Sequence, residues 1–271
     1  MKTLSRRGTG LTFAVCLILC TSVVAHDTWL IPDRFAVPRE GLVSLDLTSG
    51  MAFPALDSPI KPDRIDRALC RLSGHQFDIK DYSGAPKSLR FKAKLDEPGI
   101  ATFSVELKPR SLELTPAQVR EYLHEIDAPA AIRQQWNNAR RPRRWREVYT
   151  KHSKTFVKVG EPESDRSWAE PIGTFLEIVP EKDPTTLKAG DEFPIRVLKE
   201  GAPLSGFPIG LVHESGPKAR IGRTDAGGRV TFRLDRKGRW LLRGTELRKS
   251  IQASVDWESN FTTLTIQVGT K

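Results

Sequence analysis

The sequence predicts a mostly β protein with two β-sandwich-like domains and a helical insertion between them. Three observations support this fold class. Apolar and polar residues alternate in short segments up to about residue 110 and again after about residue 170, which is the period of strands with one buried face. Turn residues separate the later segments about every 8–12 residues, a spacing typical of sandwiches. Between these regions the apolar period becomes that of helices.

Residues 1–25 are interpreted as a cleaved secretory signal. Basic residues lie near the start, and an apolar run over 11–24 ends at Ala25, a small residue suited to cleavage. That run is shorter than the roughly 20 residues that span a bilayer. We therefore expect a periplasmic protein whose mature chain begins at His26. The alternatives are an uncleaved anchor and a lipoprotein modified at Cys20.

The overall charge and the cysteines limit the classes of function. The formal net charge is +10. Three positive charges and no acidic residue fall in the signal, so the chain from His26 carries +7. An exported chain is not expected to meet nucleic acid, and the charge instead suits anionic envelope surfaces. Cys70 is the only cysteine after the signal, so no intramolecular disulfide can form, and we expect a buried strand thiol.

The N-terminal β domain is expected over residues 26–112. Leu45 and Leu47 alternate with polar neighbours in the segment 41–50. The segment 88–107 contains two strands on either side of a Pro-Gly turn. Apolar residues on one face of each of these two strands are expected in the core: Leu89, Phe91, Ala93, Leu95, Phe103, Val105 and Leu107.

A helical insertion is expected over residues 113–155. Thr115 is a good N-cap and Pro116 suits the first helical turn. Three helices are predicted from sequence, in the segments AQVREYLHEI, AAIRQQWNNA and RRWREVYTKHSKTF. Five arginines lie close together before and within the third segment, and they indicate a solvated helix face or a contact with an anionic surface: Arg140, Arg141, Arg143, Arg144 and Arg146.

The C-terminal β-sandwich domain is expected over residues 156–271. Short apolar segments alternate with turns, and the stretch from Thr224 to Gly228 has turn residues suited to positive φ. The six tryptophans of the whole chain are expected to be core or half-buried residues, and sugar stacking is the alternative.

Five segments together resemble a known family. They read AHDTWLIPDRF, EYLHEIDAP, YTKHSKTFVKVG, GRTDAGGRVTFRLDRKGRWLLRG and DWESNFTTLTIQV. In this order they resemble the bacterial exported domain-of-unknown-function family 4198, which is grouped with periplasmic parts of nickel and cobalt uptake systems. The C-terminal strand pattern also resembles prealbumin-like and immunoglobulin-like domains. The resemblance implies a periplasmic two-part β protein with a terminal histidine and a metal-related role.

The resemblance points to a metal site at the mature N-terminus. The matching positions are His26, Asp27, Trp29 and His152, and Glu246 stands where a further histidine is expected. After cleavage, His26 would offer its α-amine, whose ordinary pKa is about 8, and a ring nitrogen to one ion. A second imidazole or a carboxylate would complete a site suited to Cu(II) or Ni(II). We expect His152 as the second imidazole, with support from Asp27 or Glu246.

Both histidines also have an interpretation that involves no metal. His26 can be a disordered terminus, and His152 can be a buried strand residue. The histidines do not have the spacing of a contiguous metal motif. Any site must therefore be assembled by the fold.

The leading functional hypothesis is a non-enzymatic periplasmic protein that binds a metal or assists its uptake. The expected ligand is a nickel, cobalt or copper ion, and the expected partner is an inner-membrane transporter or envelope component. The alternative is a structural or adhesion-like β module that binds an envelope polymer or a partner protein. A copper enzyme that uses the terminal histidine is a third hypothesis. The sequence has no GxSxG, glycine-rich phosphate loop or CxxC motif.

Overall fold

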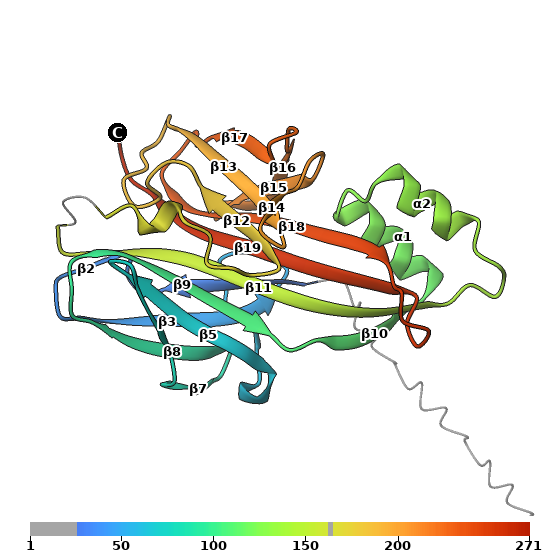
Figure 1. The fold of residues 1–271 in the computed structure, drawn as a ribbon, viewed down its shortest axis with the longest axis horizontal. Helices are drawn as coiled ribbons and strands as arrows, with labels where there is room; N and C mark the ends of the chain where they lie inside the picture. Colours follow the sequence, from blue (N-terminus) through green and yellow to red (C-terminus); the bar gives the residue numbers. More distant parts are fainter. Residues whose placement is uncertain (1–25, 162–164) are drawn as a thin grey trace, which may run out of the picture.

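The computed structural model describes residues 26–161 and 165–271 and is mostly β (Figure 1). The predicted signal, including Cys16 and Cys20, lies outside the described residues. Within them the chain forms three sheets and two short α-helices. No helix of this part of the chain is long and apolar enough to cross a membrane. The prediction of a mostly β chain with a short helical segment is confirmed.

The first sheet contains strands from the N-terminal part of the chain in the order β1-β3-β8-β7, with β4 beside β3. The strands are β1 (Asp27–Pro32), β3 (Gly41–Gly50), β4 (Ser58–Pro59), β7 (Tyr82–Ala85) and β8 (Ser88–Leu95). Leu45 lies opposite Phe91, and Leu47 lies opposite Leu89. All four side chains are fully buried, which confirms the alternation predicted for both strands.

The second sheet has ten strands and runs through the whole molecule. Its main path is β16-β15-β18-β19-β11-β9-β5-β6, with β2 and β10 also paired to β11. The strands are β2 (Ala36–Val37), β5 (Ile65–Leu72), β6 (His75–Asp78), β9 (Gly99–Leu107), β10 (Arg110–Leu114), β11 (Trp145–Val159), β15 (Pro208–His213), β16 (Gly216–Arg223), β18 (Gly238–Lys249) and β19 (Trp257–Val268). Figure 1 shows β11 and β19 side by side at its centre, where they pair in parallel. Strands from both predicted domains therefore share one sheet.

The third sheet belongs to the C-terminal part of the chain. It contains β12 (Leu176–Pro180), β13 (Glu192–Lys199), β14 (Ala202–Pro203) and β17 (Arg229–Arg233). Its apolar face packs on β15, β18 and β19 in one core. The first sheet packs on β5, β9 and the end of β11 in another core. The predicted turn before β17 is confirmed: Gly228 has φ +73°, and a Cβ there would lie 2.6 Å from the carbonyl oxygen of Val197.

Two of the predicted helices form and cover one end of the long strands (Figure 1). The helical segments are α1 (Pro116–Glu125), α2 (Ala130–Asn137) and two 3-10 turns, η1 (Pro62–Arg64) and η2 (Ser167–Ala169). The side chain of Thr115 accepts a hydrogen bond from the backbone N–H of Gln118, and the Gln118 side chain accepts one in return. This capping box explains why α1 begins at the predicted position.

The third predicted helix is wrong, because its residues form most of the 15-residue strand β11. Residues 145–149 pair with β10 and residues 147–155 pair with β19, so two ladders of backbone hydrogen bonds override the helical propensity of the charged residues in this segment. Most of the arginine cluster therefore lies in the connection between α2 and β11 and not on a helix face. Two of its members make local contacts: Arg143 donates to the carbonyl oxygen of Asn137, and Arg146 pairs with Asp256.

Candidate functional site

A cavity of about 490 Å³ lies beside His26, between η1, β10 and the neighbouring faces of β11 and β19. Its volume is in the range of small-molecule sites. Aliphatic and aromatic side chains form much of its wall, including Tyr149 and Phe261. Four basic side chains and one acidic side chain also line it: Lys61, Arg64, Arg110, Lys151 and Asp63. The cavity therefore combines an apolar wall with an excess of positive charge.

Lys151 is the central basic group of this cavity. Its ammonium donates to the carbonyl oxygen of His26 at 2.6 Å and to the hydroxyl of Thr28 at 3.0 Å. It also lies 5.6 Å from the ring centre of Tyr149 and 5.4 Å from that of Phe261. Among the described residues, no carboxylate oxygen lies within 4.0 Å of this ammonium. Burial, with nearby arginines, lowers the pKa of Lys151 to about 8.

Strand geometry explains why these groups meet. Alternate residues of a strand point to the same face, so Lys151 and Ser153 of β11 both face β1. The Ser153 hydroxyl donates to the carbonyl oxygen of Thr28 at 3.0 Å, and that of Thr263 on β19 donates to the same oxygen at 2.7 Å. These side chains fix the start of β1 across the central sheet. His26 is thereby held at the cavity.

The two predicted ligands at the N-terminus have different surroundings. His26 is half-buried and directly precedes β1. Asp27 is paired with Arg243, and Arg243 also donates to Glu125 at 3.3 Å. The carboxylate of Asp27 is therefore already neutralised by an arginine.

The other two predicted ligands lie on the opposite face of the central sheet, because His152 is adjacent to Lys151 in β11. One ring nitrogen of His152 lies 3.1 Å from Glu106, and the other lies 3.5 Å from the side-chain oxygen of Asn260. The amide nitrogen of Asn260 donates to Glu246 at 3.3 Å, and Lys199 donates to Glu246 at 2.6 Å. His152 and Glu246 thus belong to one hydrogen-bonded chain of side chains.

The four predicted ligands consequently form two separate groups. Within residues 26–161 and 165–271, no three His, Cys, Asp or Glu side chains are arranged to hold one metal ion. The four residues are therefore not gathered at one point, and of the four only His26 lines the cavity. All six tryptophans are buried, as predicted, so none offers an exposed surface for stacking on sugars.

Glu147 is a buried carboxylate outside the cavity. It accepts hydrogen bonds from Tyr122 at 3.1 Å, from Trp145 at 2.6 Å and from Ser259. Burial raises the pKa of Glu147, and these three neutral donors only partly oppose that effect. The carboxylate is enclosed between α1 and the sheet, and its oxygens accept all three of these hydrogen bonds. We therefore assign it a structural role.

Glu147 makes stability depend on pH. A carboxyl whose folded-state pKa is raised stabilises the fold below the unfolded-state pKa, and that contribution is lost as pH rises through the folded-state value. Relative to Glu147→Gln, the wild-type protein is therefore expected to lose stability as pH rises above about 4.5. Urea unfolding of both proteins between pH 4 and pH 8 measures this difference. A difference that stays constant across the range would contradict the assignment.

The sequence did not reveal the basic groups of the cavity. Lys151 stands in the segment YTKHSKTF, but the prediction of a metal ligand in this segment concerned only the neighbouring His152. A lysine in a polar segment is normally exposed. The alternation of Tyr149, Lys151 and Ser153 is the only local signal that these residues share one face of a strand.

Comparisons with known proteins identify the family but not the function. No curated protein matches the chain. Among solved structures, an adhesin named InvE from Yersinia pseudotuberculosis has a TM-score of 0.24 and 11% identity, and the match covers 88% of this chain and 58% of that one. A bacterial ice-binding adhesin has a TM-score of 0.24 and 10% identity over 90% of this chain and 65% of that one. TM-scores this low do not support an argument about function. The family model described as "Domain of unknown function (DUF4198)" matches residues 23–245, and the chain belongs to this family.

Proposed function

We propose that this chain is a non-enzymatic, exported accessory protein that binds a transition-metal ion at the N-terminus created by cleavage before His26. The proposed ion is Cu(II) or Ni(II), because an α-amine and an imidazole are both nitrogen donors and suit these ions best. The proposed setting is the periplasm, with delivery to an inner-membrane transporter or envelope component. The two cores on either side of the central sheet are proposed to be two sandwich-like units that present this terminus.

The observation that supports the proposal is the fixed position of His26. Its carbonyl oxygen is held by Lys151 at 2.6 Å, and its neighbour Asp27 pairs with Gly50 of β3. A residue held in this way loses little further conformational freedom when it chelates an ion. Of the four predicted ligands, only His26 is retained in this proposal. Asp27, His152 and Glu246 are proposed to be structural, since each already has protein partners.

The proposal is tested by titrating Cu(II) and Ni(II) into protein that begins at His26. An N-terminally acetylated form lacks the free amine, and His26→Gln lacks the ring. Each is expected to weaken binding by about 100-fold or more, since deprotonated nitrogen ligands determine the affinity. Electron paramagnetic resonance of the copper complex should show nitrogen ligation that both changes remove. The matched control is His75→Gln, because His75 is an exposed histidine far along the chain, and it should leave binding unchanged.

A second candidate function is a structural or adhesion-like β module that needs no metal. It is favoured by the ion pairs that already occupy the carboxylates of Asp27 and Glu246. Equal metal affinity in the unmodified, acetylated and His26→Gln proteins would reject the terminal chelate and favour this candidate.

A further inference from the structure

The strongest unassigned feature of the molecule is the charge of the 490 Å³ cavity. Its four basic residues face one acidic side chain, that of Asp63. Among the described residues, none of the four basic groups has a carboxylate within 4.0 Å, although nineteen such ion pairs form elsewhere in the molecule. Two of the four, Arg64 and Lys151, are half-buried, where a charge normally has a partner. The cavity therefore lacks the negative charge that its walls would favour.

Two of the basic groups are fixed in position. The hydrogen bonds of Lys151 to His26 and Thr28 leave one of its three N–H donors unassigned. Arg64 donates through Nη2 to the carbonyl oxygen of Lys108 at 2.8 Å and lies 5.9 Å from the ring centre of Tyr149, and its Nη1 makes no hydrogen bond to a described residue. Both side chains therefore have N–H groups left over for a ligand, and the hydrogen bonds to backbone oxygens hold them in place. Arg110 and Lys61 are exposed at the cavity and add charge there.

The rest of the wall narrows the chemistry of the ligand. Phe261 and Leu107 are buried apolar residues that line the cavity, and Tyr149 adds an aromatic ring. A small inorganic anion would leave this apolar surface in contact with water. An organic anion with a flat apolar part would pair with the cations and cover the apolar wall at the same time.

We propose that this cavity binds a small organic carboxylate, with Lys151, Arg64 and Arg110 contacting the carboxylate group and Tyr149 and Phe261 contacting an apolar part. The proposed contacts come from side chains of β10, β11, β19 and η1 and do not use the amine or the ring of residue 26, although Lys151 also holds the His26 carbonyl oxygen. It accounts for four unpaired cations that the metal proposal leaves without a role.

The test uses three probes and the protein that begins at His26, in buffer containing EDTA so that no metal takes part. The probes are 2-naphthoate, its neutral analogue 2-naphthamide and inorganic phosphate, and calorimetry measures their affinities. 2-Naphthoate is expected to bind at least about tenfold more tightly than 2-naphthamide, because charge-assisted hydrogen bonds need the carboxylate. Phosphate is expected to bind more weakly than 2-naphthoate, because it cannot use the apolar wall. Tighter binding of phosphate would replace the organic carboxylate with a phosphate ligand and overturn the proposal.

Variants connect the binding to the cavity. Arg110→Gln changes an exposed residue and is expected to weaken 2-naphthoate binding about tenfold without affecting the fold. Lys151→Met is expected to weaken it at least as much. Lys92→Gln is the matched control, because Lys92 is an exposed lysine of β8 outside the cavity. Equal affinity in Arg110→Gln, Lys92→Gln and wild-type protein would overturn the proposal, as would absence of 2-naphthoate binding at millimolar concentration. Either failure leaves the metal titration unaffected, since that measurement depends on the N-terminal amine and ring.

Discussion

Replacing Glu177 with Gln is expected to lower the free energy of unfolding by about 3–5 kcal/mol. Glu177 of β12 forms a 2.7 Å ion pair with Lys154 of β11, and the exposed fractions of the two side chains are 2% and 7%. The carboxylate also accepts the backbone N–H groups of Ile172 at 2.8 Å and Gly173 at 3.0 Å. The amide would leave the ammonium without a counter-charge in the interior, and burial already lowers the pKa of Lys154.

A double variant separates the pair from the rest of the packing. Lys154→Met combined with Glu177→Gln removes both charges, and the amide oxygen keeps an acceptor for one of the two backbone N–H groups, which bond to different oxygens of the carboxylate. We expect it to lose less stability than Glu177→Gln alone, because the unpaired charge is gone. Urea unfolding at pH 7 of wild-type protein, Glu177→Gln, Lys154→Met and the double variant gives the coupling energy between the two charges. Losses that simply add would show that the two charges act independently, contrary to this expectation.

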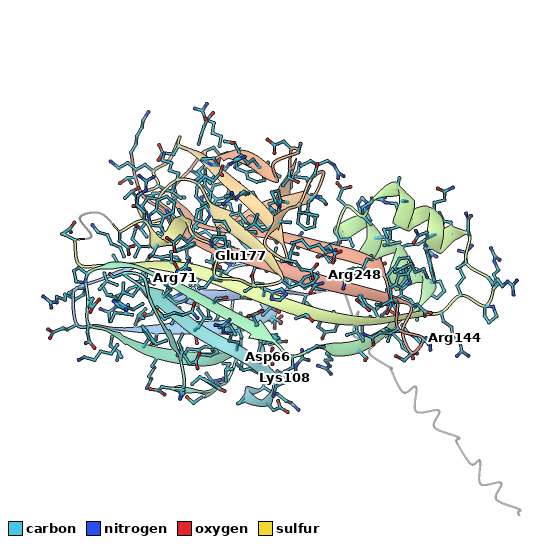
Figure 2. The ribbon with its side chains drawn as sticks, viewed as in Figure 1. Asp66, Arg71, Lys108, Arg144, Glu177 and Arg248 are labelled. Carbon is cyan, nitrogen blue, oxygen red and sulfur yellow. The ribbon has the colours of Figure 1, made fainter. Side chains whose placement is uncertain are left out.

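The effect is expected to be large because the pair lies where the C-terminal sheet meets the central sheet. Figure 2 shows Arg71 and Glu177 at this junction. The Arg71 guanidinium donates to the carbonyl oxygens of Ser167, Glu170 and Pro171. Arg71 and Glu177 thus hold successive parts of the segment that leads from β11 into β12. Loss of either charge would loosen the same connection between two sheets.

Local patterns in the sequence predicted those parts of the fold that depend on local interactions. The alternation in β3 and β8 identified the buried faces, because each strand has one face in the core. The capping residues identified the start of α1, since a cap acts within one turn of the helix. Cys70 is a buried strand residue whose thiol pKa is raised by burial, as expected for an unreactive thiol.

The features that depend on distant contacts were not predictable. β11 contains charged residues with no clear two-residue period, and its parallel partner β19 lies more than a hundred residues later in the chain. Pairings with β9, β10 and β19 together make the segment a strand, and the pairing with β19 continues one sheet through both predicted domains. The same reason applies to the site. His26 is recognisable as a candidate terminal residue, whereas Lys151 gains its position beneath β1 from contacts that the local sequence does not encode.

The second large effect is expected at Trp145. Its side chain is 1% exposed, and its ring stacks on Trp257 with centres 4.4 Å apart. It also contacts Trp136 and Tyr122 edge to face, so it joins both helices to the central strands. Trp145→Ala is expected to lower the free energy of unfolding by about 3–5 kcal/mol, because it opens a cavity in this cluster. It also removes one of the three hydrogen bonds to Glu147.

The matched variant Trp145→Phe keeps an aromatic ring but lacks the N–H donor. It is expected to cost about 1–3 kcal/mol, because it leaves a buried carboxylate with one fewer donor. Urea unfolding of the three proteins, followed by both circular dichroism and tryptophan fluorescence, measures the two contributions. The cluster includes Trp257 and Phe261 of the central strand β19, so we expect the two signals to change together. A separate early loss of helical signal in Trp145→Ala would instead mean that α1 and α2 unfold independently of the sheet.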